Sequence, residues 1–125
     1  MNDKQEVYIE ENGPGVLANG ELFHELYSRE ELAKFKRMPG FKVILFTAPW
    51  LEAGILQKNM LLDLFEQRKE NCSFASTNLD IGDIQEYLID NGFASFPLTL
   101  IFKDSELVGS SNGATSIHEI ENKIV

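Results

Sequence analysis

A short apolar strand that leads through a Pro-Trp turn directly into a long helix constrains the fold of this chain most. The run from Phe41 to Phe46 is β-branched and aromatic and follows the turn pair Pro39-Gly40, which predicts a buried strand. Pro49 ends the strand, because proline cannot donate to a sheet ladder. From Leu51 to about Glu70 the apolar residues recur with helical spacing. The predicted unit is therefore a strand, a tight turn and a helix.

The same alternation continues along the chain. Further strands are predicted at residues 22–27, 72–79, 98–102 and 107–108. Shorter helices are predicted to begin at three capping boxes, which start at Ser28, Asp83 and Ser116. Strands that alternate with helices form parallel sheets through right-handed crossovers, and the last two strands add an antiparallel hairpin. The sequence predicts an α/β fold with a mixed central sheet and helices on both faces.

The long helix is expected to lie on this sheet through an apolar stripe. Its apolar residues form two neighbouring rows: Leu56, Met60, Leu64, Leu61 and Phe65. The opposite face is predicted to be polar, with Gln57, Lys58, Asp63, Gln67 and Lys69.

The chain divides into a short N-terminal extension, residues 1–20, and one domain, residues 21–125. The extension contains Val7-Tyr8-Ile9 before the turn cluster Asn12-Gly13-Pro14-Gly15. Two interpretations remain open at this point, an edge strand or a loose arm.

Charge and cysteine content exclude several functional classes. The 125 residues carry a net charge of −9 and no cluster of Lys or Arg, which argues against nucleic acid and anionic membranes as partners. Cys72 is the single cysteine, so the chain cannot form an internal disulfide or a redox pair. No apolar leader or membrane-length run is found, so a cytoplasmic location is expected.

Four motifs in the stretch from Leu22 to Val125 resemble the thioredoxin family. They are the Ala48-Pro49-Trp50 turn, the pair Phe96-Pro97, the hairpin from Phe102 to Val108, and Gly113-Ala114. The resemblance implies a thioredoxin-like fold. It also implies a cis peptide bond between Phe96 and Pro97, facing the turn.

The departures from the family pattern form a coherent set. Leu51 and Gly54 stand where the family has its two cysteines, and Leu45 stands where it has a buried acid that assists proton transfer. The resemblance therefore implies a degenerate active-site turn without disulfide exchange: Trp50, Leu51, Glu52, Ala53 and Gly54. Glu52 is interpreted as a carboxylate that the helix macrodipole favours in the first turn.

The resemblance also implies a groove in which an extended peptide binds by backbone hydrogen bonds beside the proline. Carried over by position, the groove comprises Trp50, Leu51, Ile55, Phe96, Pro97, Asn112 and Gly113. The leading hypothesis is a redox-silent binding module, acting as a chaperone, assembly factor or complex subunit without catalytic residues. In general design it resembles cysteine-free thioredoxin-like chaperones of hydrogenase assembly. The competing interpretation is that Leu51 and Ile55 fold under a neighbouring loop or the N-terminal arm.

Two other hypotheses remain. A thiol enzyme working through Cys72 alone would need an exposed thiol with a lowered pKa, whereas the simpler interpretation of Cys72 is a small core residue. A self-associating protein would use the arm or the groove as a homodimer contact. His24 and His118 have no neighbouring ligand pattern, so neither a metal nor another cofactor is expected.

Overall fold

The structure is a computed structural model that describes residues 22–114 and 116–124. Its elements follow one another in the predicted order, strand, helix, strand, helix, strand, helix, strand, strand, helix. The N-terminal extension, residues 1–20 with the predicted strand Val7–Ile9, lies outside the described residues, so both interpretations of it stay predictions.

A five-stranded mixed sheet forms the centre of the molecule. In chain order its strands are β1 (Phe23–Leu26), β2 (Phe41–Thr47), β3 (Cys72–Asn78), β4 (Leu98–Lys103) and β5 (Glu106–Asn112). They lie in the order β1-β3-β2-β4-β5. The first three run parallel, while β4 and β5 are antiparallel to their neighbours. The predicted fold class is confirmed. The Pro-Trp turn directly follows β2, which is the middle strand of the sheet.

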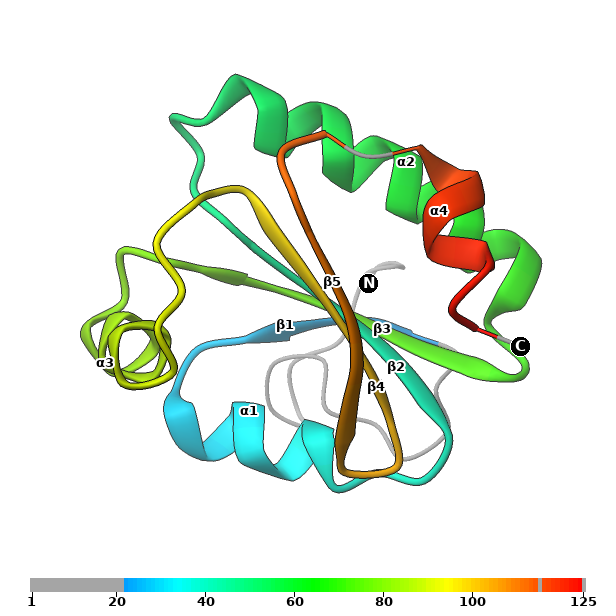
Figure 1. Ribbon diagram of the computed structural model, residues 1–125, viewed down its shortest axis with the longest axis horizontal. Helices are drawn as coiled ribbons and strands as arrows, with labels where there is room; N and C mark the ends of the chain where they lie inside the picture. The colour runs from blue at the N-terminus through cyan, green and yellow to red at the C-terminus, as the bar shows by residue number, and fades with distance from the viewer. Residues whose placement is uncertain (1–21, 115, 125) are drawn as a thin grey trace, which may run out of the picture.

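Helices cover both faces of the sheet. Figure 1 shows α1 (Arg29–Lys36) and α3 (Gly82–Asp90) on one face, and α2 (Glu52–Arg68) and α4 (Ile117–Glu121) on the other. Alternate residues of β2 enter the two cores. Ile44 and Phe46 pack toward α1 and α3, while Val43 and Leu45 pack toward α2 and α4. All four are fully buried, and such burial stabilises the fold by about 1.5–3 kcal/mol for each side chain.

The N-caps predicted at Ser28 and Ser116 are confirmed. Ser28 Oγ accepts from the Glu31 N–H at 3.1 Å, and Glu31 returns a bond to the Tyr27 N–H at 2.8 Å. Ser116 Oγ accepts from the Glu119 N–H at 3.4 Å.

The capping box predicted at Asp83 is wrong. Helix α3 begins at Gly82, two residues before the start at Ile84 that an N-cap at Asp83 implies, and its N-cap residue is Ile81, which makes no side-chain cap hydrogen bond. Asp83 lies inside the first turn, where the helix macrodipole favours a carboxylate. Its Oδ2 accepts from the Arg29 N–H at 3.4 Å, so Asp83 contacts the start of α1 instead of capping its own helix.

The apolar stripe predicted for α2 is also wrong in part. Leu61, Leu64 and Phe65 are buried as expected, but Leu56 is 55% exposed. Gln57, predicted on the solvent face, is fully buried, and its Nε2 donates to Thr99 Oγ1 of β4 at 3.3 Å. The buried face of α2 is therefore rotated away from Leu56, because a hydrogen bond to the sheet satisfies the amide of Gln57.

A buried lysine lies at the other end of the sheet from the Pro-Trp turn. Lys42 of β2 is fully buried. Its Nζ donates to the carbonyl oxygens of Met38 and Gly40, which belong to the connection between α1 and β2. Burial lowers the pKa of Lys42, against the field of Asp104 that raises it.

In the described part of the chain, no helix is long and apolar enough to cross a membrane.

Candidate functional site

The Pro-Trp turn is held by the first turn of α2. Leu51 is the N-cap residue with an extended backbone, and its N–H donates to Ala48 O at 3.0 Å. Its carbonyl accepts from the N–H groups of Gly54 and Ile55 at 3.0 and 3.2 Å. Glu52 then lies exposed in the first turn, as expected. The side chain of Leu51 has no polar atom, so it cannot cap the helix.

Trp50 is exposed, and its indole is tied to the neighbouring strand end. The side chain is 64% exposed, and Nε1 donates to Asp80 Oδ2 at 2.8 Å. The Asp80 N–H in turn donates to Asn78 Oδ1 at 2.8 Å. The predicted strand at residues 72–79 and the predicted helix start at Asp83 leave Asp80 in a connecting loop, and no local pattern predicts its contact with Trp50. The available signal was that Asp80 follows a parallel strand next to β2, so both loops leave the same edge of the sheet.

The Phe96-Pro97 bond is cis, as the resemblance implied. The Pro97 carbonyl accepts from the Gly113 N–H at 2.8 Å, and Asn112 pairs with Leu98 across the hairpin. Gly113 has a φ of 76°, in the left-handed region that favours glycine. The structure thus brings together Phe96, Pro97, Asn112 and Gly113 at one end of the β4–β5 hairpin.

The turn and the cis-proline lie at the same end of the sheet. Phe46, shortly before the turn, pairs with Leu98, immediately after Pro97. Leu51 and Phe96 are both half-buried and pack against the same apolar cluster. The backbone N–H and C=O of Phe96 make no hydrogen bond to any other residue in 22–114 or 116–124. An unpaired backbone segment therefore lies beside an apolar surface.

Ile55 lies on the far side of the turn from the cis-proline. It is 53% exposed and lines a pocket between α2 and the ends of β1 and β3. Ala53 is exposed as well. The predicted groove is therefore not one continuous surface. Leu51 and the residues around Pro97 form one cluster. Trp50 instead contacts Asp80, and Ile55 borders a separate hollow. Whether all seven residues bind one ligand stays a prediction.

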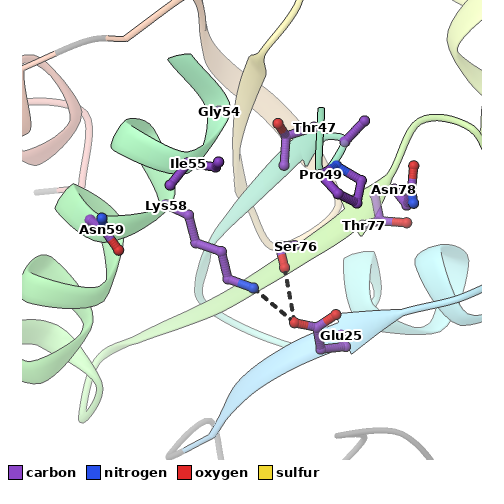
Figure 2. A pocket seen from close by; sticks show the side chains of 11 residues that line it. Glu25, Thr47, Pro49, Gly54, Ile55, Lys58, Asn59, Ser76, Thr77 and Asn78 are labelled. Carbon is purple, nitrogen blue, oxygen red and sulfur yellow. Dashed lines mark hydrogen bonds and ion pairs between the residues drawn. The ribbon is translucent and has the colours of Figure 1, made fainter. Parts of the chain in front are cut away.

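The position of the second family cysteine is closed by packing. Gly54 is buried, and a Cβ atom built there would lie 1.7 Å from Thr47 Oγ1 and 2.9 Å from Thr47 Cβ. Figure 2 shows Thr47 beside this first part of α2. Leu45, at the position of the family's acid, is fully buried in the core. The packing around the turn therefore suits an apolar corner without a thiol.

Cys72 lies far from the turn. It opens β3 opposite Phe41, whereas Thr47 at the turn pairs with Asn78, so about 20 Å of strand separates them. The side chain is 4% exposed, and burial raises the pKa of the thiol to about 12. Lys42 and Arg68 lower that pKa by less than burial raises it. Among the described residues, no group of His, Cys, Asp and Glu could hold a metal ion.

Comparison with solved structures identifies the fold. Thioredoxin 3 of Saccharomyces cerevisiae mitochondria superimposes with a TM-score of 0.70 at 20% identity, covering 82% of this chain and 92% of that chain. The fold is that of thioredoxin. The thioredoxin of Trypanosoma brucei brucei gives 0.71 at 18% identity over 81% and 86% of the two chains. A point mutant of the thioredoxin from Halobacterium salinarum gives 0.70 at 19% identity over 80% and 85%.

No model of a known protein family and no curated protein matches the sequence. At identities of 20% or less, the shared feature is the thioredoxin fold. The sequence places a single cysteine in that fold, outside the turn, so the Cys-x-x-Cys pair is absent.

Proposed function

We propose that this protein is a redox-silent thioredoxin-like binding module that holds an extended segment of a partner protein, as a chaperone, assembly factor or complex subunit does. The segment pairs with the backbone of Phe96, beside Pro97. Leu51 and Phe96 provide the apolar floor, Trp50 forms one rim, and Asn112 with Gly113 borders the other side. No residue of the chain acts as a catalyst in this proposal.

The unpaired backbone of Phe96 carries the proposal. Its N–H and C=O have no hydrogen-bond partner among the described residues, and such groups are what an extended peptide pairs with in β-type recognition. The apolar side chains next to it supply the pocket contacts that give such binding its specificity. The net charge of −9 favours a neutral or basic segment, because opposite charges steer association.

Selection of peptides from a random library against the protein tests the proposal. Trp50 is the single tryptophan of the chain, so its fluorescence reports binding at the turn directly. Selected peptides should change this fluorescence and compete with one another for one site. Leu51→Asp should weaken their binding at least about tenfold, since it puts a carboxylate into an apolar contact.

Ile89→Asp is the matched control, because Ile89 is 71% exposed on α3, outside the groove. It should bind peptides like the wild type and recover the same proteins from a lysate. Leu51→Asp should remain folded, since aspartate is a favoured N-cap residue and offsets part of the lost packing. If Leu51→Asp binds peptides as the wild type does, the groove is not the site. Sedimentation at micromolar concentration separates this proposal from a homodimer through the same surface.

The alternative hypothesis of thiol chemistry at Cys72 has no supporting observation in the structure. A reactive cysteine needs an accessible thiol whose pKa is lowered. Cys72 is buried with a raised pKa, which argues against this role. Rapid alkylation of Cys72 in the native protein at neutral pH would be the observation that supports thiol chemistry.

A further inference from the structure

A pocket of about 250 Å³ lies between α2 and the carboxyl ends of β1 and β3. Figure 2 shows it from close by, with Ile55 and Lys58 reaching in from the helix and Glu25 and Ser76 from the strands. The volume is slightly below the range of about 300–1,000 Å³ that holds drug-sized ligands. It therefore suits a ligand smaller than a drug-sized molecule.

An ion pair with unused hydrogen-bonding capacity lies at the wall of the pocket. Lys58 Nζ lies 2.9 Å from Glu25 Oε2, and Ser76 Oγ donates to the same oxygen at 3.5 Å. Both contacts use Oε2, so Oε1 has no hydrogen-bond partner among the residues that the structure describes. An ammonium group has three N–H donors, and only one of those of Lys58 is directed at Glu25. The Lys58 ammonium also lies over the Phe23 ring, 5.8 Å from the ring centroid. A free acceptor on Glu25 therefore lies beside an ammonium group that has N–H donors left for a ligand.

We propose that this pocket binds a primary carboxamide carried on a short aliphatic stem. The NH₂ of such a group donates to Glu25 Oε1 while its carbonyl oxygen accepts from Lys58 Nζ, so the ion pair stays intact. The two sides of an amide present one donor and one acceptor next to each other, which matches the arrangement in the wall. The stem lies against Ile55 and Pro49, which also line the pocket.

Charged ligands of the same size fit less well. A carboxylate is attracted by Lys58 but repelled by Glu25, and an ammonium group is attracted by Glu25 but repelled by Lys58. Either ion must also separate a pair that is in contact at 2.9 Å. A neutral group with both a donor and an acceptor avoids both costs. The carboxamide can belong to an Asn or Gln side chain of a partner or to a free small molecule.

The pocket is separate from the groove of the proposed function. In the sheet, β1 and β3 lie on one side of β2, and β4 with the cis-proline lies on the other. Only Ile55 belongs to both sets of residues. Binding in the pocket can therefore fail or succeed independently of peptide binding beside Pro97.

Titration of the full-length protein with three probes of equal length tests the assignment: butyramide, butyrate and n-butylammonium. Amide NMR signals of Glu25, Ser76 and Lys58 report on the pocket. Butyramide should shift these signals with a dissociation constant on the order of 10 mM, as expected for six non-hydrogen atoms in a half-open site. Butyrate and n-butylammonium should bind at least about fivefold more weakly. Equal or tighter binding of either ion would overturn the proposal.

Two variants separate a charge-specific site from an unspecific hollow. Glu25→Gln removes the repulsion of anions, so butyrate should now bind better than butyramide. Lys58→Met removes the donor and should weaken butyramide about fivefold. Lys69→Met is the control, because Lys69 lies at the end of α2 and pairs with Glu66 instead; it should bind butyramide like the wild type. If Glu25→Gln leaves the order of the probes unchanged, the ion pair does not select the ligand.

The source of the carboxamide is distinguished by two further probes. Free L-glutamine carries its own charged groups, whereas acetyl-Gly-Gln-Gly-N-methylamide presents the same side chain within a peptide that has no other primary carboxamide. Tighter binding of glutamine assigns the pocket to a small molecule, and tighter binding of the peptide assigns it to a partner's side chain. Absence of pocket shifts with both, and with butyramide, would contradict the proposal.

Discussion

At the scale of single residues, the packing of the turn leaves no room for the second cysteine of a dithiol at position 54. A Cβ atom at position 54 would lie 1.7 Å from Thr47 Oγ1, a distance that nonbonded atoms do not tolerate. A cysteine therefore cannot return to position 54 unless Thr47 moves or changes. Gly54 and Thr47 form one packing unit, and substitutions at the two positions should be coupled.

Gly54→Ala should destabilise the protein, although alanine is the better helix former by about 1 kcal/mol. Overpacking a filled site costs about 1–3 kcal/mol, so the free energy of unfolding in urea should fall, by up to about 2 kcal/mol. Adding Thr47→Ala should recover most of the loss. Gly82→Ala is the control, because nothing lies within 4 Å of the Cβ that it adds. A Gly54→Ala protein as stable as the wild type would refute this packing.

Cys72 should make stability depend on alkaline pH. Its thiol pKa is raised from 9.0 to about 12 in the folded protein, so the neutral thiol stabilises the fold fully below pH 9. That contribution should disappear as the pH rises from 9 to 12, at no more than about 1.4 kcal/mol per pH unit. The difference in unfolding free energy between wild type and Cys72→Ala isolates it. A difference independent of pH in this range would mean that the thiol is not shielded as the structure indicates.

At the scale of elements, Lys42 joins the end of α1 to the start of β2. Its buried Nζ donates to two backbone carbonyls of the connection. Lys42→Ala should lower the free energy of unfolding by about 2–4 kcal/mol, since it leaves those carbonyls unpaired and a cavity in place of the side chain. The measurement is urea unfolding followed by far-UV circular dichroism.

Lys34→Ala is the matched control for this prediction. Its Nζ lies 3.8 Å from Glu30 on the surface of α1, and its side chain is 58% exposed, so the change in stability should stay below about 0.5 kcal/mol. Equal effects of the two alanine substitutions would show that Lys42 does not anchor the connection.

Within single elements, some local sequence signals predict the structure and others do not. Ser28 and Ser116 cap their helices because the cap and the group it binds are three residues apart, a distance that sequence displays. Asp83 and Gln57 were misplaced because their partners, Arg29 and Thr99, lie on other elements. Helix α2 is apolar on more than one side, with Leu56 and Leu62 exposed. Periodicity alone therefore could not select its buried face.

At the scale of the whole molecule, the element order and the mixed sheet could be predicted because alternation and crossover handedness leave few arrangements. The cis Phe96-Pro97 bond came from the family resemblance. The indole contact with Asp80 and the pocket beside Glu25 could not be predicted. Both arise where loops and strand ends that are distant in sequence meet at one edge of the sheet, and no local pattern records such meetings.

Amide hydrogen exchange at Phe96, followed by NMR with and without a selected peptide, tests whether a bound segment pairs with the backbone beside Pro97. The Phe96 N–H has no hydrogen-bond partner among the described residues, so it should exchange rapidly in the free protein. A bound segment that pairs with it should slow exchange at least about tenfold at saturation. Peptide binding that leaves exchange at Phe96 unchanged would contradict the account of a groove beside Pro97.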